Sequence, residues 1–391
     1  MDSPLNEAAR KVVDDAIATR VTEQKTYLAS SVADPLPVAR ADLLYLWDDR
    51  HTEYLDWASL GNPIGHRHPI VAGAVAEHPR YYGHTAPQGR HALRWPVQYA
   101  KDLSEQFTGE GEAPRKVLFT EGEREAVLQA IRLAVGTTSA LPEVATVGGN
   151  YDWFPSGYTY YPPVFDPADA AWDRVSALLL NMADDQAHTM RPGAARRWIL
   201  AAREAGKPVI VDETVTGFGR LGLMWAHQAT GLTPDILVLG GPVGGGYPLG
   251  VVVATPETFG GFPIDVSSQA GNPVACCAGS STLTAMSMGT LEYMSEADPI
   301  FQKGLESLVA QFGHYLCGHH GWGYLRGLRL ESVESATRLV SEALDQGLYL
   351  APPVGSVVVL APVLITSTTE ISRGIDILAS VLLSWDEVLA E

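Results

Sequence analysis

The chain has 391 residues, of which 46% are hydrophobic and 18% are charged, and this length is sufficient for more than one hydrophobic core. Its 45 acidic and 27 basic residues give a formal net charge of −18, which argues against nucleic acid or an anionic membrane as partner. Three cysteines, no signal-type leader and no apolar run of membrane-spanning length favour a cytoplasmic protein that acts on small molecules.

The N-terminal part is predicted to be a helix followed by two short strands. Apolar residues recur at helical spacing over residues 5–17, which predicts an amphipathic helix. Two short strands are expected around the turn at residues 48–52. We assign residues 1–40 to an N-terminal helical segment that packs on the small domain or on a partner.

From about residue 117 apolar strands alternate with helical segments. Strand-like runs such as "KVLFT", "VSALLLN", "PVIVDE" and "DILVLG" are separated by helical runs such as "REAVLQAIRLAV". This alternation predicts an α/β fold class, with a large domain over residues 41–298 whose mainly parallel sheet is flanked by helices. Residues 299–391 are predicted to form a small C-terminal α/β domain. Functional groups are expected at the carboxyl ends of the strands, namely Thr120, Asn181, Asp212 and Gly240.

The segment "VIVDETVTGFGRLGLMWAHQATGLTPDILVLGGPVGGGYPLGVVVA" resembles the central signature of the class III, ornithine-type aminotransferases. The likeness extends to "YLDWASLGNPIGHRHP", "VLFTEGEREAVLQAIRLA" and "GNPVACCAGSSTLTAMSMGTLE", and it covers essentially the whole chain in the family's order. It implies an aspartate-aminotransferase-like fold and a homodimer with its site at the subunit interface. It also implies a pyridoxal phosphate cofactor bound to a lysine as a Schiff base.

Two motifs differ from the family's pattern. Gly241 stands where the resemblance places the Schiff-base lysine, and Gly122, Glu123 and Arg124 stand where Ser-Gly-Thr binds the cofactor phosphate. Thr120 to Glu123 has the spacing of a capping box, so we expect Glu123 to occupy the N–H groups that bind phosphate in the family. From these changes the sequence predicts that no cofactor is bound, although the family would supply pyridoxal phosphate.

The remaining pocket residues suggest acid and base chemistry. The resemblance matches Tyr151 to the aromatic residue that stacks on the cofactor ring, and Asp212 to the carboxylate that pairs with the pyridine nitrogen. It also matches Ser268 to a threonine that reaches the phosphate of the neighbouring subunit. Close carboxylates in a dry pocket raise one another's pKa. The predicted catalytic residues are Tyr151, Asp152, Asp212 and Glu213, and the predicted substrate-binding residues are Glu123, Arg124, Trp153, Asn181 and Ser268.

Structural roles compete with these interpretations. Asp212 is as well explained as an anchor of its strand end, and Tyr151 as a wall of the pocket. Cys276 and Cys277 lie in a helix rich in small residues and are interpreted as packing residues. The His and Cys residues at 314–320 have ligand chemistry but no second ligand pair, so no metal site is predicted.

Three functions remain open. The favoured hypothesis is an enzyme independent of pyridoxal phosphate that uses acid–base chemistry on an amine or amino-acid-derived metabolite, by cyclisation, dehydration, isomerisation or condensation. A second is a non-catalytic subunit that partners an active aminotransferase. A third is a transaminase that holds pyridoxal phosphate non-covalently and uses another base.

Overall fold

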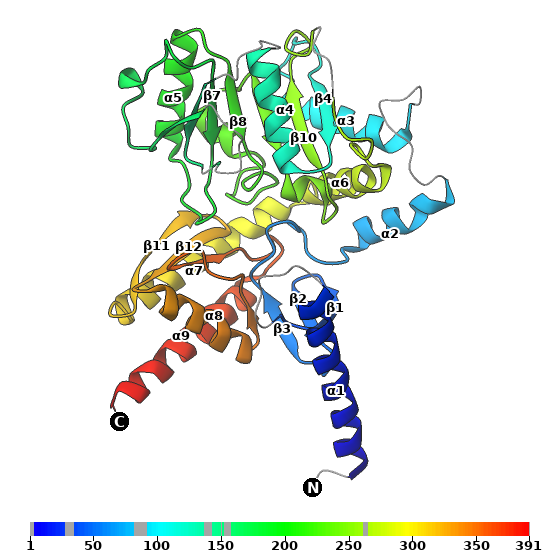
Figure 1. Ribbon diagram of the computed structural model, residues 1–391, viewed down its shortest axis with the longest axis vertical. Coiled ribbons are helices and arrows are strands. Elements are labelled where there is room, and N and C mark those ends of the chain that lie inside the picture. Colours follow the sequence, from blue (N-terminus) through cyan, green and yellow to red (C-terminus); the bar gives the residue numbers. More distant parts are fainter. Residues whose placement is uncertain are drawn as a thin grey trace.

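The computed structural model describes residues 4–27, 35–81, 92–136, 143–149, 151, 158–260 and 265–390. These residues form an upper and a lower half, which α6 and α7 connect along one side (Figure 1). The α-helices of the described residues are α1 (Pro4–Tyr27), α2 (Pro69–Glu77), α3 (Arg94–Phe107), α4 (Glu123–Val135), α5 (Pro192–Glu204), α6 (Pro273–Met286), α7 (Thr290–Gln311), α8 (Val333–Asp345) and α9 (Thr368–Ala390). The strands are β1 (Val38–Asp42), β2 (Tyr45–Asp48), β3 (Glu53–Asp56), β4 (Lys116–Thr120), β5 (Val144–Val147), β6 (Tyr158–Tyr161), β7 (Ala177–Asn181), β8 (Val209–Asp212), β9 (Ile236–Leu239), β10 (Gly250–Ala254), β11 (Leu316–Trp322), β12 (Leu325–Leu330), β13 (Leu348–Tyr349) and β14 (Val357–Leu360).

The upper half is built on one seven-stranded sheet with the order β4-β10-β9-β8-β7-β5-β6. β10 runs antiparallel to both of its neighbours, and the pairs from β9 to β6 are parallel. The predicted α/β class with a mainly parallel sheet is therefore confirmed.

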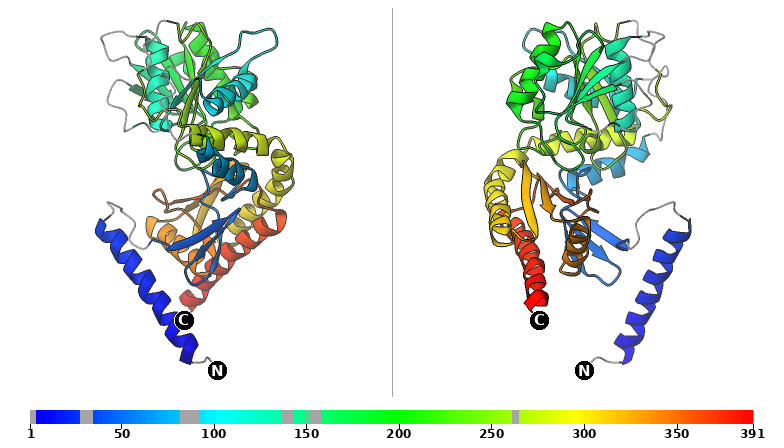
Figure 2. Two further views of the ribbon diagram at one scale, coloured as in Figure 1. Left: turned by 90° about the vertical axis from the view of Figure 1, so that its right-hand side faces the viewer. Right: turned by 60° about the vertical axis from the view of Figure 1, so that its left-hand side comes forward.

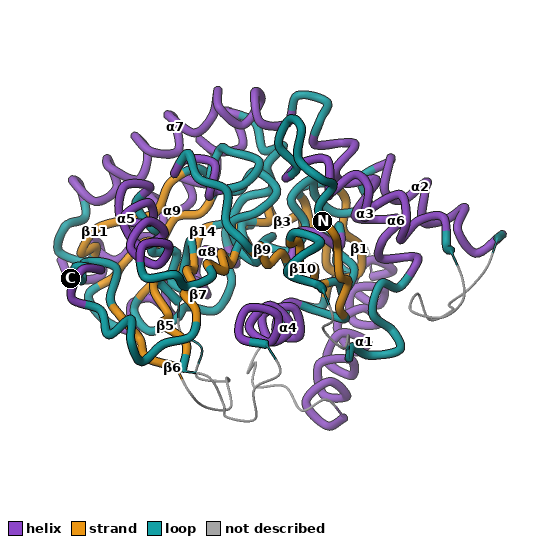
Figure 3. The backbone as a smooth tube through the Cα atoms, turned by 90° about the horizontal axis from the view of Figure 1, so that it is seen from above, coloured by secondary structure: helices purple, strands orange, loops and turns teal. Residues whose placement is uncertain are grey.

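Side chains of these strands alternate between two faces, and each face has its own helical cover. Ile210, Val238 and Val252 pack in one cluster with the apolar side of α4. Val209 and Val211 pack in the other cluster, together with residues of α3 and α5. Figure 3 shows α4 end-on against the sheet, on the side away from α3 and α6. The first turn of α4 is thereby held beside the ends of the central strands.

The lower half contains two further sheets, with the orders β11-β12-β14 and β1-β2-β3-β13. β13 pairs in parallel with β3 through Leu348↔Leu55 and Tyr349↔Asp56. The predicted large domain began at residue 41, but this pairing puts residues 38–56 in the lower half, with the C-terminal part of the chain. The two-residue strand β13 joins segments nearly 300 residues apart, a connection that no local pattern reports.

The N-terminal helix α1 extends away from the body of the protein, beside β1 and β2 (Figure 2). Two ion pairs connect it to the turn after β2. Arg20 lies 2.6 Å from Asp49, and Arg50 lies 2.8 Å from Asp14. Arg20, Arg50 and Asp14 are at least half exposed and Asp49 is partly buried, so these pairs contribute little to stability.

Polar side chains lie at two places where the halves meet. The fully buried Arg220 donates to the carbonyl oxygens of Ser59, Tyr324 and Pro362, and Ser59 lies 2.7 Å from its Nη2. At a second junction the imidazole rings of His188 and His320 stack with a centroid distance of 3.9 Å and an interplanar angle of 5°. These contacts connect loops of the upper half to strands of the lower half.

The helices in the described ranges include none with the length and apolar character needed to cross a membrane. The cytoplasmic location expected from the sequence stays a prediction.

Candidate functional site

The carboxyl ends of the central strands meet at one edge of the seven-stranded sheet, as the sequence predicts. Asn181 ends β7 and pairs with Asp212, which ends β8. Thr120 ends β4, and Gly240 follows β9 directly. Because these positions share an edge, their polar groups can act on one ligand.

Asp212 lies at the centre of this edge with only 2% of its surface exposed. Its Oδ2 accepts a hydrogen bond of 2.8 Å from the Tyr151 hydroxyl, and its Oδ1 accepts one of 2.9 Å from the Thr214 backbone N–H. Burial raises the pKa of Asp212, and the hydrogen bonds from Thr214 and Tyr151 oppose that rise. The carboxyl group is thus held by two hydrogen bonds, but no cationic side chain is among the main causes of its pKa shift.

Tyr151 is buried and lies on the same side of the sheet as α4. Burial raises the pKa of its phenol well above 10, and the negative charge of Asp212 raises it further, while a hydrogen bond with Asn181 lowers it. The phenol therefore stays protonated at neutral pH and donates to Asp212. Tyr151, Asn181 and Asp212 form one hydrogen-bonded group, in which the Tyr151 hydroxyl contacts both of the other side chains.

The start of α4 differs in detail from the expected capping box. The N-cap is Gly122, and its neighbour Thr120 donates to the Gly122 carbonyl oxygen over 2.8 Å. The carboxylate that caps the turn belongs to Glu125, which accepts from the backbone N–H of Glu121 at 2.8 Å and of Ser267 at 3.1 Å. The prediction that Glu123 caps this turn is wrong, because the helix begins two residues later than the pattern suggested and its third residue is Glu125.

Glu123 is instead the first residue of α4, and a Cβ added to Gly240 would lie 2.6 Å from the Cβ of Glu123. Its pKa is raised by burial and then by the negative charge of Asp212, and the neighbouring Arg124 lowers it. The negative charge of Asp212 therefore disfavours a second negative charge on Glu123.

Glu213 does not join them, and the expectation that it converges with Asp212 is wrong. Its side chain turns to the opposite side and accepts hydrogen bonds from the backbone N–H groups of Ala226 and His227, at 2.6 and 2.8 Å. Its Oε1 also lies 2.5 Å from Nδ1 of His227, which is itself buried. Successive residues at a strand end point to opposite faces, and this alternation separates Glu213 from Asp212. The buried partner His227, 14 residues away, gave no local sequence signal.

The other predicted residues lie around the edge. Asp152 and Trp153 are outside the described residues. Ser268 is exposed, one residue after Ser267, whose hydroxyl donates to Glu121. Gly241 opens the 3-10 turn Gly241–Gly244 with φ of +46°, and a Cβ at this position would lie 3.1 Å from the carbonyl oxygen of Thr214.

The cysteines and the C-terminal histidines lie elsewhere. Cys276 and Cys277 are buried in α6, where burial raises the pKa of both thiols, to about 11 for Cys277. This agrees with a packing role. His314 contacts Asp386 at 2.8 Å, and His320 contacts the Gln186 carbonyl oxygen. Within the described ranges, no three His, Cys, Asp or Glu side chains are grouped so as to hold a metal ion.

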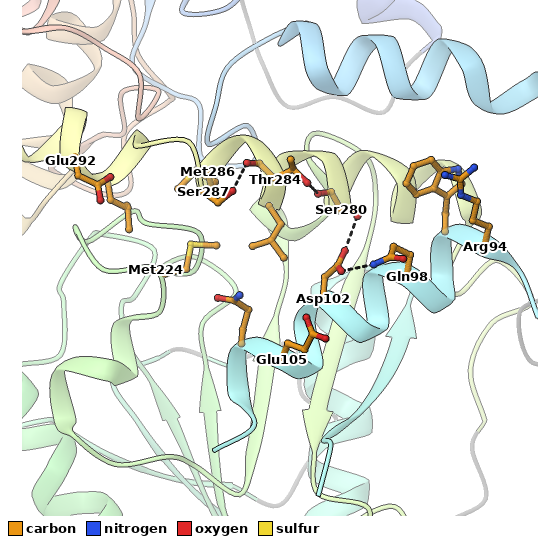
Figure 4. Close-up of a pocket in the computed structure, with 14 residues that line it drawn as sticks. Arg94, Gln98, Asp102, Glu105, Met224, Ser280, Thr284, Met286, Ser287 and Glu292 are labelled. Atoms are coloured by element: carbon orange, nitrogen blue, oxygen red, sulfur yellow. Dashed lines mark hydrogen bonds between the residues drawn. The ribbon is translucent and has the colours of Figure 1, made fainter. Parts of the chain in front are cut away.

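A groove of about 670 Å³ lies between α3, α6 and the start of α7. Figure 4 shows Arg94 at one end and Glu292 at the other, with Asp102 between them. Asp102 accepts hydrogen bonds from Gln98 at 2.7 Å and from Ser280 at 2.9 Å. None of the predicted site residues lines this groove, so it is separate from the edge around Asp212.

Comparison with known proteins gives a consistent relationship. The family model described as aminotransferase class-III matches residues 198–382. The acetylornithine aminotransferase of Streptomyces coelicolor is 30% identical over 368 residues, which cover 84% of this chain and 86% of that protein. The acetylornithine aminotransferase of Caldanaerobacter subterraneus is 27% identical over 400 residues, covering 93% of this chain and 98% of that protein.

Solved structures agree on the fold. Acetylornithine aminotransferase from Elizabethkingia anophelis superposes with a TM-score of 0.83 at 21% identity, covering 94% of this chain and 99% of that one. Ornithine aminotransferase from Toxoplasma gondii gives a TM-score of 0.84 at 18% identity, with 100% of both chains covered, and its structure has pyridoxal phosphate at partial occupancy in the active site. These likenesses confirm the aminotransferase-type α/β fold.

The favoured function from the sequence is contradicted by these relatives. They are aminotransferases of a family that depends on pyridoxal phosphate, so the prediction of an enzyme independent of this cofactor is wrong. The prediction that no cofactor is bound is wrong for the same reason, and pyridoxal phosphate is the cofactor to expect. The prediction that the chain is an enzyme agrees with the relatives. Because it is 30% identical to a relative of which it covers 86%, the chain belongs to the class III aminotransferase family.

Proposed function

We propose that this chain is a transaminase that holds pyridoxal phosphate without a covalent bond and acts on the amino group of a small amino-acid-derived metabolite. The names of its relatives point to acetylornithine or a similar diamino acid as the first substrates to test. The observation that carries the proposal is the buried carboxyl group of Asp212, held by Tyr151 and Thr214 at the edge of the sheet.

The charge at this edge fits the ring of the cofactor. A buried carboxylate with a second carboxyl group nearby is stabilised by a positive charge, and a protonated pyridine nitrogen supplies one. Asp212 would hold that nitrogen, and Asn181 and Thr214 keep the carboxylate in place through Tyr151 and the Thr214 N–H. When bound, the cofactor supplies an electron sink for removal of a proton beside the amino group.

In our proposal this chain lacks the lysine that anchors the cofactor covalently in the family. Gly241 occupies the position that the resemblance gives to lysine, and glycine has no side chain that can form a Schiff base. Of the lysines in the described residues, Lys116 comes closest in sequence to a site motif, and it opens β4 at the end remote from Thr120. We therefore expect a cofactor that exchanges with solvent.

The phosphate end fits less well than the ring end. The first turn of α4 offers a helix N-terminus, which favours an anion. The carboxylates of Glu121, Glu123 and Glu125 surround the same turn, and Arg124 is the basic residue within it. Repulsion between carboxylate and phosphate predicts weak binding that improves as the carboxyl groups are protonated.

Titration of the protein with pyridoxal phosphate tests the proposal. We expect a saturable absorbance and fluorescence change that dialysis reverses, with no mass increase after borohydride reduction. Asp212→Asn should weaken binding by about tenfold or more, because one charge-assisted hydrogen bond is lost. The control Asp169→Asn, at an exposed position on the 3-10 turn Pro167–Asp169, should leave the affinity unchanged. Equal affinity of the wild-type and Asp212→Asn proteins would contradict the proposal.

We also propose a homodimer with the site at the subunit interface. The support is the family relationship and the exposed position of Ser268 beside the first turn of α4, where Ser267 already contacts Glu125. Light scattering of the purified chain checks this proposal, and a monomer at micromolar concentration would contradict it.

A further inference from the structure

A second groove, of about 520 Å³, lies between the C-terminal half of α3 and the start of β4. Its volume is within the range of small-molecule sites in proteins. β4 is an edge strand of the seven-stranded sheet, with Lys116 as its first residue and Thr120 as its last. Because Lys116 and Val117 line the groove, it lies at the opposite end of β4 from the candidate site around Asp212.

The groove is basic in a chain that is strongly acidic. The formal net charge of the chain is −18, and yet two of its six lysines, Lys101 and Lys116, line the groove together with Arg115. The carboxylate among the lining residues is that of Glu105, which lies 3.7 Å from Nζ of Lys101. About two thirds of each side chain in this pair is exposed, so water screens their attraction. Positive charge therefore predominates in the groove.

Arg115 carries a buried charge with an incomplete set of partners. Only 9% of this residue is exposed. Its Nη1 donates to the carbonyl oxygens of Pro234 at 3.1 Å and of Asp235 at 3.5 Å, and its buried Nε donates to no group of the described residues. Within the same ranges no carboxylate forms an ion pair with the guanidinium. A buried cation without an anion is costly, so a bound anion would stabilise this group.

The backbone of Arg115 is held in place by α3 and by the residue that follows it. The Ser104 hydroxyl donates to the Arg115 carbonyl oxygen at 2.7 Å, and the Arg115 N–H donates to the Thr108 hydroxyl at 3.2 Å. Thr108 in turn donates to the Ser104 carbonyl oxygen at 2.7 Å. The guanidinium is therefore positioned before any ligand binds, which lowers the entropic cost of binding.

Apolar groups lie beside these cations. Ala100 of α3, Pro114 and Val117 of β4 also line the groove. Inorganic anions gain nothing from such a surface, whereas a hydrocarbon chain is stabilised by contact with it. The lining thus favours an anion that has an apolar body.

We propose that this groove binds a small organic acid, whose carboxylate pairs with Arg115 and the two lysines and whose apolar chain lies on the aliphatic residues. A guanidinium matches a carboxylate in geometry as well as in charge. The residues of the groove do not belong to the edge around Asp212, so this second site stands independently of the proposed transaminase function.

Saturation-transfer NMR of hexanoate, titrated into the full chain at low salt, tests the proposal. We expect saturable binding with a dissociation constant of about 1 mM or below. Arg115→Gln should weaken it by about tenfold or more, because a charge-assisted hydrogen bond and a buried charge are lost. Lys303→Gln, at an exposed position on α7, removes the same charge elsewhere and should bind hexanoate as the wild type does. Wild-type protein that does not bind hexanoate would overturn the proposal.

Lysine variants keep the test decisive if Arg115→Gln does not fold. Lys101 and Lys116 are exposed, so the double variant Lys101→Gln, Lys116→Gln should fold normally and should also bind hexanoate about tenfold or more weakly. Unchanged affinity in this double variant would overturn the site. Arg124→Gln, at the start of α4, should retain the wild-type affinity, and a loss there would place the ligand at the other end of β4.

Related compounds test the class of ligand. Acetate and inorganic phosphate have the charge without the chain, and we expect both to bind at least about tenfold more weakly than hexanoate. Hexylammonium has the chain with the opposite charge and should not bind in the groove. Acetate or phosphate binding as tightly as hexanoate would overturn the role of the apolar residues, and hexylammonium binding equally well would overturn the role of the cations.

Discussion

Gly241 has a backbone conformation that other residues adopt at a cost. Its φ of +46° lies in the left-handed region, and a Cβ would also approach the Thr214 carbonyl oxygen to 3.1 Å. The position is therefore adapted to glycine, and this local backbone is consistent with our proposal that the chain has no covalent anchor for its cofactor.

Replacing Gly241 by lysine should destabilise the protein. We expect a loss of about 1–2 kcal/mol in the free energy of unfolding, because a residue with a Cβ is strained in the left-handed region. Gly241→Ala is the matched control and should lose a similar amount, since the strain comes from the Cβ. Urea denaturation measures both variants, and a lysine variant as stable as the wild type would refute this view of the backbone.

At this scale the sequence predicted part of the site. Asp212 and Asn181 were located correctly because both end strands, and parallel strands bring their ends to one edge. Glu213 and the cap of α4 were placed wrongly. Which face a side chain takes, and at which residue a helix begins, depend on tertiary contacts such as those of His227 and Ser267.

Among the helices, α4 has the start that bears most directly on the site. The Glu125 carboxylate accepts hydrogen bonds from the backbone N–H groups of Glu121 and Ser267, so it joins the helix to the segment that follows β10. The cap therefore fixes the position of Glu123 two residues earlier.

Glu125→Ala should destabilise the protein by about 0.5–2 kcal/mol, the usual effect of losing a capping side chain. Glu334→Ala is the control, because Glu334 is also an acidic residue in a first helical turn, that of α8, where Ser332 provides the cap. Thermal unfolding compares the two, and an equal loss in both variants would show that charge at the helix end, rather than the double cap, is responsible.

The order of strands and helices was more predictable from the sequence than the pairing of the strands. Alternating strands and helices identified the parallel sheet, because buried strands and amphipathic helices have distinct periodicities. The pairing of β13 with β3 was not predictable, since two residues carry no periodic pattern. The boundary at residue 41 failed for that reason.

The whole molecule depends on Arg220 at the junction of its halves. The guanidinium is fully buried, burial lowers its pKa to about 10, and its three carbonyl partners come from segments far apart in the chain. A planar group with several donors is required to reach all three.

Arg220→Lys should reduce the free energy of unfolding by about 2–4 kcal/mol, because a single ammonium nitrogen cannot reach carbonyl oxygens that two separate guanidinium nitrogens bind, and its charge stays buried. Arg197→Lys, at an exposed position on α5, is the control and should have little effect. Guanidinium denaturation provides the measurement, and similar midpoints for the two variants would contradict a structural role for Arg220.

The stacked histidines make the second junction sensitive to pH. Burial lowers the pKa of His320, and the charges of His188 and Arg329 lower it further, against the Gln186 carbonyl group and Asp184. In the unfolded chain the pKa of a histidine is about 6.5, so above that pH His320 is neutral in both states and its contribution to stability is fully present. As the pH falls below 6.5 toward the lowered pKa of the folded state, protons bind to the unfolded chain first, and this contribution is lost.

We therefore expect the melting temperature of the wild type to fall between about pH 8 and about pH 5 by more than that of His320→Gln, which carries no charge at either pH. The control His51→Asn, in the exposed turn after β2, should retain the wild-type dependence. A His320→Gln variant with the full wild-type dependence would contradict a pH-sensitive junction.

The pairing of β3 with β13 has a consequence for synthesis of the chain. During translation residues 92–286 are complete while β3 is paired only with β2, because the partner of its other edge lies about 290 residues downstream. Until the ribosome has released the segment around Leu348, residues 53–56 present an open strand edge to other molecules. Nascent chains of this protein should consequently depend on chaperones most strongly late in elongation, after the larger sheet has already formed.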